Sequence, residues 1–174
     1  MTVDKTTESL NTTLLEMLSV SEAANKTIFI SGGFAIDIAV GRLTRNHDDI
    51  DAHPLEVDIS WWKSWFKSKG FSIRYVDKIK DHSKAFVAYS PDQSYHVDMF
   101  GVKLNAEGKL SSAEGGLRHD WSINPYGRER ITATWQSHNV TIFDPVGILW
   151  LKRDTARRNN TELRAKDIQD IKLI

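Results

Sequence analysis

Two aspartates in the segment HDDIDA, residues 47–52, are the residues of this chain best suited to catalysis. The segment predicts a strand, and side chains alternate between the faces of a strand, so Asp49 and Asp51 point one way and Asp48 the other. Neighbouring carboxylates repel each other unless a cation lies between them, and magnesium prefers oxygen ligands of this kind. The pair therefore predicts a magnesium site. His47 shares the face of Asp49, but at a strand entry we expect it to make a local hydrogen bond.

A glycine turn precedes this pair. Residues 28–30 are apolar and predict a short strand, Ser31-Gly32-Gly33 interrupt it, and residues 34–40 are compatible with a helix. Glycines let the backbone approach a ligand closely, and the free N–H groups of a helix's first turn attract phosphate. We therefore expect Ser31, Gly32 and Gly33 to cradle a phosphate group.

A third carboxylate, Asp98, lies in a predicted strand at residues 95–102. Alternation places His96 on its face and apolar side chains on the opposite face. An unpaired carboxylate in an apolar strand costs several kcal/mol to bury, so Asp98 should lie near a positive charge or in a solvated cleft. The alternative is an ordinary aspartate on an edge strand.

Taken together, these features resemble the signature of the polymerase-beta-like nucleotidyltransferase superfamily. More narrowly, GGFAID (32–37), GRLTR (41–45) and HDDID (47–51) resemble the small aminoglycoside nucleotidyltransferases. LNAEG (104–108) is instead similar to the lincosamide nucleotidyltransferases, and RAKDIQDI (164–171) resembles the Arg-x-Lys-Asp ending of many small-molecule nucleotidyltransferases.

The resemblance implies an α+β (mixed α/β) fold: a polymerase-beta-like nucleotidyltransferase core with a mixed sheet flanked by helices, followed by C-terminal helices. The length of 174 residues suits one domain, with a catalytic core at 1–143 and a helical end at 144–174. Asp144-Pro145 is typical of a helix start. The basic residues of the helical end form either a solvated face or part of the Arg-x-Lys-Asp motif.

The resemblance also implies roles for the polar residues. Asp49 and Asp51 would bind the magnesium that bridges the nucleotide phosphates. Asp98 would accept the proton of an acceptor hydroxyl and could also contact a second metal ion. Arg45 would either clamp a phosphate, because a guanidinium pairs bidentately with phosphate oxygens, or form a structural pair with Asp37.

The reaction that this family carries out is the transfer of AMP from ATP to a hydroxyl of a small molecule, with release of pyrophosphate. The expected acceptor is an aminoglycoside or a lincosamide antibiotic, and the irregular segment 111–128 is the expected acceptor wall. One alternative is a minimal nucleotidyltransferase of a toxin–antitoxin pair that modifies or binds a protein partner. Another is a non-catalytic binding module, against which the intact set of three carboxylates argues.

The composition limits the kinds of partner and metal site that we expect for this chain. Lys and Arg number 23 and Asp and Glu number 23, so no net charge draws the chain toward nucleic acid or anionic membranes. The absence of cysteine excludes disulfides and thiolate metal sites, and the histidines lack zinc-site spacing. Neither a signal-peptide pattern nor a membrane-spanning segment is evident. We expect a cytoplasmic enzyme that binds ATP, magnesium and a small acceptor, and neither nucleic acid nor a membrane.

Overall fold

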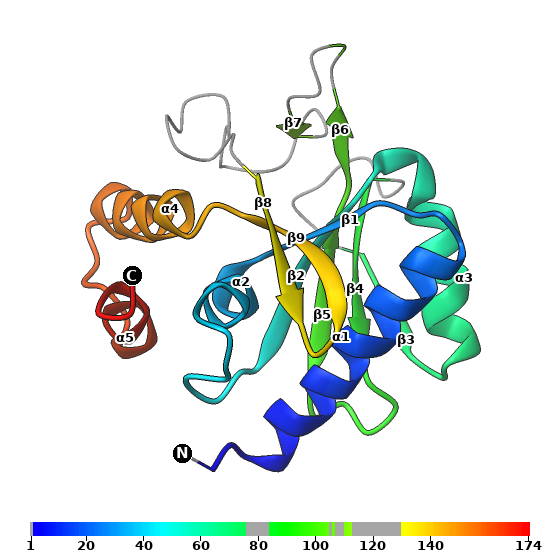
Figure 1. The fold of residues 1–174 in the computed structure, drawn as a ribbon, viewed down its shortest axis with the longest axis horizontal. Coiled ribbons are helices and arrows are strands. Elements are labelled where there is room, and N and C mark those ends of the chain that lie inside the picture. Colours follow the sequence, from blue (N-terminus) through cyan, green and yellow to red (C-terminus); the bar gives the residue numbers. More distant parts are fainter. Residues whose placement is uncertain (1, 76–83, 105, 107–109, 113–129) are drawn as a thin grey trace.

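The computed structural model describes all residues except 1, 76–83, 105, 107–109 and 113–129 (Figure 1). Its helices are α1 (Lys5–Ala23), α2 (Gly32–Val40), α3 (Ile59–Ser68), α4 (Pro145–Arg158) and α5 (Ala165–Ile171), with a short 3-10 turn at Glu56–Asp58. Its strands are β1 (Ile28–Ser31), β2 (Asp49–Pro54), β3 (Ser72–Arg74), β4 (Ala85–Tyr89), β5 (His96–Phe100), β6 (Val102–Leu104), β7 (Leu110–Ser112), β8 (Arg130–Trp135) and β9 (His138–Phe143).

Seven of these strands form one mixed sheet in the order β3-β4-β5-β2-β1-β9-β8, and β6 pairs with β7 in a small separate sheet. The central strand β2 runs antiparallel to β1 and parallel to β5, and β1 runs parallel to β9. In Figure 1, α1 and α3 lie on one side of the large sheet, and α2, α4 and α5 lie on the other. The predicted mixed sheet flanked by helices is confirmed.

One face of the sheet is apolar and forms the main core. On β2 and β5, the side chains of Ile50 and Val97 are fully buried. The helices above them contribute Leu14 from α1 and Trp62 and Phe66 from α3, also with no exposed area. Because side chains alternate along a strand, this burial commits the alternate residues, Asp49 and Asp51 on β2 and His96 and Asp98 on β5, to the opposite face.

Helix α4 begins where the sequence predicts. The Asp144 carboxylate accepts a hydrogen bond of 3.0 Å from the backbone N–H of Val146, and Pro145 occupies the first turn of α4. A short link then leads to α5, and α4 and α5 pack against each other. Helix α4 also contacts α2, so the helical end lies against the glycine turn.

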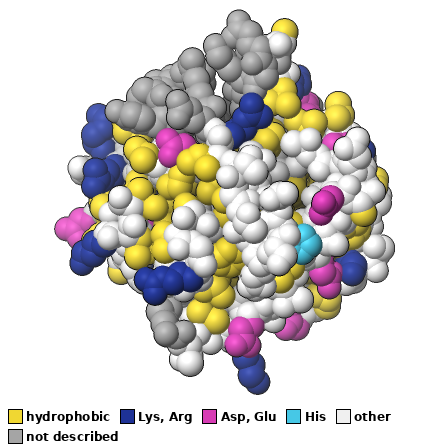
Figure 2. Space-filling view, in the orientation of Figure 1, with side chains coloured by type: hydrophobic (Ala, Val, Ile, Leu, Met, Phe, Trp, Pro, Cys, Tyr) yellow, Lys and Arg dark blue, Asp and Glu magenta, His cyan; other side chains and the backbone are white. Residues whose placement is uncertain are grey.

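The face drawn in Figure 2 shows no concentration of one charge among the residues in colour. On the face drawn in Figure 2, Lys and Arg side chains are interspersed with Asp and Glu among the residues shown in colour. Within the part of the chain that the structure describes, no helix combines the length and apolar character needed to cross a membrane.

Candidate active site

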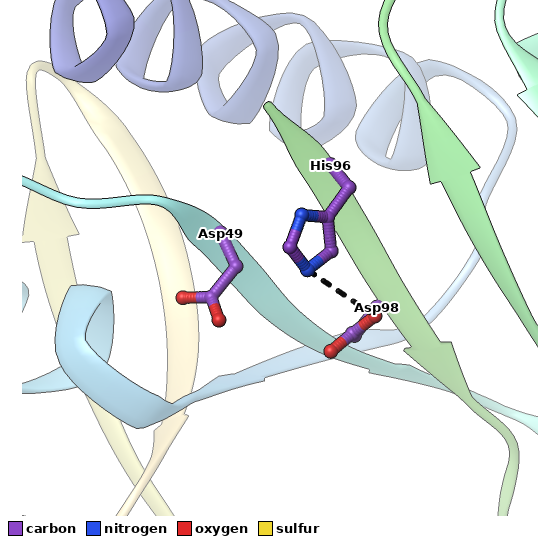
Figure 3. A group of neighbouring side chains, drawn as sticks. All are labelled: Asp49, His96 and Asp98. Atoms are coloured by element: carbon purple, nitrogen blue, oxygen red, sulfur yellow. Dashed lines mark ion pairs between the residues drawn. The ribbon is translucent and has the colours of Figure 1, made fainter. Parts of the chain in front are cut away.

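The parallel pairing of β2 and β5 brings the predicted carboxylates together. Asp49 lies opposite His96 and Asp51 lies opposite Asp98, so all four side chains stand on the polar face of the sheet. Figure 3 shows Asp49, His96 and Asp98 on these two strands. One ligand atom from each of these three residues lies within 4.8 Å of the others.

Three carboxylates, those of Asp49, Asp51 and Asp98, lie close together on the polar face of β2 and β5. Burial, and then the carboxylates of Asp49 and Asp98, raise the pKa of Asp51 to about 7, while Lys152 and Lys166 act in the opposite direction. Burial and the Asp49 carboxylate likewise raise the pKa of Asp98 to about 7. These are the shifts expected of carboxylates that a divalent cation would have to neutralise, and their oxygen atoms are the ligands that magnesium prefers. The residues present therefore fit a magnesium ion. We refer to Asp49, Asp51 and Asp98 as the carboxylate cluster.

The two glycines of the turn make room for side chains of the protein itself. Gly32 has a φ of +63°, and a Cβ atom there would collide with Oδ2 of Asp51. A Cβ atom on Gly33 would collide with Nη2 of Arg45 and would lie 2.8 Å from the His47 ring. Because both positions lack a side chain, the Asp51 carboxylate can lie against Gly32, and the buried Arg45 guanidinium can lie against Gly33.

Ser31 is the last residue of β1 and occupies the N-cap position of α2. Its hydroxyl lies 2.8 Å from Nε2 of His53, and its side chain makes no capping hydrogen bond to α2. Burial lowers the pKa of His53 to about 4, so this imidazole is neutral near pH 7. The first N–H groups of α2 are therefore not satisfied by the Ser31 hydroxyl, and such groups at a helix start favour an anion.

Arg45 lies behind the glycine turn, in the protein interior. Its Nε and Nη2 atoms donate to the two carboxylate oxygens of Asp170, at 2.9 and 3.2 Å, and both side chains are buried. Its Nη1 atom donates to the carbonyl of Asn46 and lies 3.1 Å from Nδ1 of His47. The structure therefore favours the structural role for Arg45 over the phosphate clamp, with Asp170 of α5 as its partner instead of Asp37.

Asp37 satisfies a different set of donors, in keeping with the structural role expected of it. Its carboxylate accepts from the backbone N–H of Thr44 at 3.1 Å and lies 2.6 Å from Nε2 of His47, which confirms the local hydrogen bond predicted for this histidine. Lys152 of α4 completes the arrangement by donating to Asp170 at 3.0 Å. We refer to Asp37, Arg45, His47, Lys152 and Asp170 as the support network.

The basic residues of the helical end divide between two roles. Arg157 is a solvated residue, 77% exposed and paired with Asp154. Lys152 is 12% exposed and also donates to Asp167 at 2.7 Å, while Lys166 lies 3.5 Å from the exposed carboxylate of Asp48. Lys152 and Lys166 lower the pKa of Asp51, so both lie close enough to act on the carboxylate cluster. The sequence shows that the helical end is basic, but it does not show which of its residues lie near the carboxylate cluster. That position depends on the packing of α5 against the loop before β2.

The sequence assigns His96 no role, although its spacing of two residues from Asp98 on a strand is a usable signal that the two side chains lie close together. The segment expected to form the acceptor wall, 111–128, lies almost entirely outside the described residues.

The fold is shared with solved structures of antibiotic-modifying enzymes. The lincomycin-bound lincosamide antibiotic adenylyltransferase LnuA superposes with a TM-score of 0.69 at 19% sequence identity, covering 92% of each chain. The solution structure of the antibiotic-resistance factor ANT(2'')-Ia gives a TM-score of 0.73 at 20% identity, covering 96% of this chain and 83% of that one. The complex of ANT(2'')-Ia with adenylyl-2''-tobramycin gives 0.70 at 21% identity, covering 95% and 87%. At these identities the likeness establishes the fold, which is that of nucleotidyltransferases.

Sequence comparison gives the family. The chain belongs to the aminoglycoside-2''-adenylyltransferase family, whose model matches residues 13–172. Among individual proteins, the 2''-aminoglycoside nucleotidyltransferases of Klebsiella pneumoniae and Escherichia coli are each 45% identical over 40 residues. That match spans 23% of this chain and 23% of the length of each relative.

Proposed function

We propose that this protein is a magnesium-dependent nucleotidyltransferase that moves AMP from ATP onto a hydroxyl of an aminoglycoside antibiotic and releases pyrophosphate. The observation that carries the proposal is the position of Asp49, Asp51 and Asp98 on one face of two adjacent strands, beside the start of α2, in a chain that belongs to this family.

Asp49 and Asp51 would hold the magnesium. When bound, the ion neutralises charge on the triphosphate and on its leaving group, which is the main requirement of nucleotidyl transfer. The two aspartates contribute by fixing oxygen ligands on the rigid central strand, where Asp51 is buttressed against Gly32. Ser31, at the N-cap of α2, and Gly32 and Gly33, in its first turn, would cradle the phosphate, with backbone N–H groups donating to phosphate oxygens.

Asp98 would accept the proton from the attacking hydroxyl. It stands on a different strand from the magnesium pair, and its side chain is 22% exposed, so an acceptor has access to it. A general base works best when its pKa lies near the working pH, and the pKa of Asp98 is raised to about 7. Its carboxylate would take the proton as the hydroxyl oxygen forms a bond to the α-phosphorus and the bond from that phosphorus to the pyrophosphate oxygen breaks.

The family match favours an aminoglycoside over a lincosamide, although solved relatives of this fold include enzymes titled for both drug classes. The proposal also covers the location, the domain organisation and the partners of the protein. The chain would act in the cytoplasm as one transferase unit, with 1–143 carrying the reacting groups and 144–174 bracing the glycine turn. With a net charge of zero it would need no nucleic acid or membrane.

The test is a release assay for pyrophosphate. The protein is incubated with ATP and magnesium, together with tobramycin, with lincomycin, or with neither drug, and the product is checked by mass spectrometry for an added AMP. We expect release that depends on tobramycin. Release with lincomycin alone would correct the acceptor, and no release with a broad panel of either class would refute the proposal.

A further inference from the structure

Strand β8 is an open edge of the large sheet. It is the last strand in the sheet order, and among the described residues it pairs with β9 alone. Within the described part of the chain, the backbone of residues 131–135 makes no hydrogen bond beyond the ladder with β9. In Figure 1, α1 lies on one side of β8 and α2 on the other, so neither helix covers the edge itself. The outward N–H and C=O groups of β8 are therefore available to another strand.

The side chains of β8 do not protect this edge. Proteins usually prevent edge pairing with a very short strand, a charged residue or a proline. Residues 131–135 contain neither a charged residue nor a proline. Ile131 is 43% exposed, and Thr132 and Thr134 are exposed as well. An exposed strand rich in β-branched residues favours pairing with a further strand.

The opposite edge of the sheet has the protection that β8 lacks. Strand β3 has three residues, against six in β8. Its Arg74 lies over the ring of Tyr89 and donates to Gln93 at 3.4 Å. A short strand with a charged side chain is typical of an edge that stays unpaired, so β8 is the edge that we expect to pair.

We propose that β8 is the interface of a homodimer, in which it pairs antiparallel with β8 of a second copy and joins the two large sheets. The two-fold axis of such a pair is perpendicular to the sheet, so residues of one face meet residues of the same face. The register centred on Ala133 places Ile131 of one copy opposite Trp135 of the other. It also places Thr132 opposite Thr134.

This register makes β8 complementary to itself. Ile131 and Trp135 form an apolar pair on the side of α1, where the Trp135 indole donates to Asn11 at 2.9 Å. On the other face the pair consists of two threonines, and aromatic–β-branched pairs and threonine pairs both stabilise neighbouring strands.

Charge does not oppose the pairing of two copies. The two Arg130 side chains would start about 20 Å apart along the strands, well beyond the screening length of about 8 Å at physiological salt. The whole chain has no net charge, so two copies have no long-range repulsion to overcome.

The oligomeric state gives the first test. One strand edge is a small interface, so we expect a reversible dimer whose population rises with protein concentration. Sedimentation equilibrium of the full chain from about 5 µM to about 1 mM measures it. A protein that remains monomeric over this range would overturn the inference.

Paired charge variants test the interface and its register. Thr132→Glu with Thr134→Glu places carboxylates opposite each other in the dimer, and Thr132→Lys with Thr134→Lys does the same with ammonium groups. Each double variant alone should associate at least about tenfold more weakly than the wild type, whereas an equimolar mixture of the two should associate at least as tightly. A dimer that either variant leaves unchanged, or a mixture no tighter than its components, would overturn the proposed pairing.

The matched control adds the same charge elsewhere. Ser64→Glu with Ser68→Glu changes two exposed residues of α3, which packs against β3 and β4 at the other end of the sheet. We expect its association constant to lie within about threefold of the wild type, because its new charges are far from β8. An equal loss in this control would attribute the effect to net charge and overturn the assignment to β8.

Hydrogen exchange locates the contact without any variant. The outward amides among residues 131–135 should exchange more slowly at concentrations where the dimer dominates than in the dilute monomer, while the amides of β3 should not change. Protection that rises only in other elements would overturn the inference. Amides of β8 that are equally protected in the dilute monomer would do so too, because the edge would then already be covered.

Discussion

The glycine turn lies between two polar clusters: in one, opposite charges are paired, and in the other, like charges lie close together. Behind Gly33, the support network pairs every charge: the guanidinium of Arg45 is bound bidentately by Asp170, and Lys152 donates to the same carboxylate. In front of Gly32, the carboxylate cluster gathers like charges, and the pKa values of Asp51 and Asp98 rise to about 7.

We infer from this difference that the support network is structural, and the contrast agrees with the reacting role proposed for the carboxylate cluster. A buried network with matched charges holds elements together, here α5 against the loop before β2. A cluster of like charges costs stability in the folded protein and is kept only where a ligand or a reaction needs it. The two clusters approach adjacent glycines, with Asp51 against Gly32 and Arg45 and His47 against Gly33.

The largest expected effect is on the reaction. Asp51→Ala should reduce tobramycin-dependent transfer by about 10³-fold or more, because charge stabilisation worth several kcal/mol is lost. The same change should leave the midpoint of thermal unfolding equal or higher, since it relieves repulsion with Asp49 and Asp98. Turnover and thermal unfolding are measured together, with Asp48→Asn as the control, because Asp48 lies just before β2 and its side chain is 83% exposed. If Asp48→Asn were equally inactive, the loss could not be assigned to the carboxylate cluster.

Breaking the support network should affect stability instead. Asp170→Ala leaves the Arg45 guanidinium buried without its carboxylate, and the expected loss is about 3–5 kcal/mol in the free energy of unfolding measured with urea. Asp154→Ala is the matched control, because it removes the partner of two exposed arginines, Arg157 and Arg158, and should cost about 1 kcal/mol or less. Equal losses in the two variants would contradict the distinction between structural and solvated pairs in the helical end.

Asp98→Asn tests the division of work within the carboxylate cluster. The variant keeps the side-chain shape and loses the basicity, so transfer should fall by about 10²-fold while ATP with magnesium still binds. Calorimetric titration of ATP with magnesium, beside turnover, measures both. Near-normal turnover would remove the role of base, and lost nucleotide binding would make Asp98 chiefly a metal ligand.

Gly33→Ala separates two reasons for a glycine at this position. Close approach to phosphate predicts weaker ATP binding by a stable protein, whereas the collision of a Cβ atom with Arg45 and His47 predicts a loss of about 1–3 kcal/mol in the free energy of unfolding. We expect the loss of stability. Unchanged unfolding together with weaker ATP binding would restore the phosphate explanation.

The smallest expected effect is on pH dependence. Because the pKa values of Asp51 and Asp98 are raised in the folded protein, the folded state binds more protons than the unfolded state between pH 4 and 7, and stability falls as pH rises through about 7. His53, whose pKa is lowered to about 4, instead reduces stability as pH falls below 6.5. Thermal unfolding from pH 6.5 to 8 should therefore show a decline of about 1 kcal/mol after solvent screening, and magnesium should reverse it. The decline should shrink to about half in Asp51→Asn and disappear when Asp98→Asn is added, because each carboxylate contributes to it. A decline that persists in the double variant would place its origin elsewhere.

Much of the fold followed from local sequence. The alternation around Asp49 and Asp51 predicted the polar face of β2, because burial of Ile50 and Ala52 leaves no other orientation. Asp144-Pro145 predicted the start of α4, because capping is decided within one turn of the chain.

The partners of charged side chains could not be predicted in this way. Arg45 and Asp170 are far apart in sequence, and a guanidinium pairs equally well with any carboxylate, so nothing local distinguishes Asp170 from Asp37. The sequence also does not show why position 33 must be a glycine. A side chain there would collide with Arg45, and the place of Arg45 depends on its pairing with Asp170 of α5.

The sequence by itself determined the strand pattern, the two aspartates on one face of β2, the glycine turn and the class of chemistry, because each depends on residues close together in the chain. Only the tertiary structure decided that β5 lies parallel to β2 in the register that sets His96 beside Asp49 and Asp98 beside Asp51. It also decided that Arg45 pairs with Asp170 instead of Asp37. The physical reason is that strand register and the pairing of distant charges depend on how whole elements pack, and packing free energy is shared among many residues and is not encoded in any one motif.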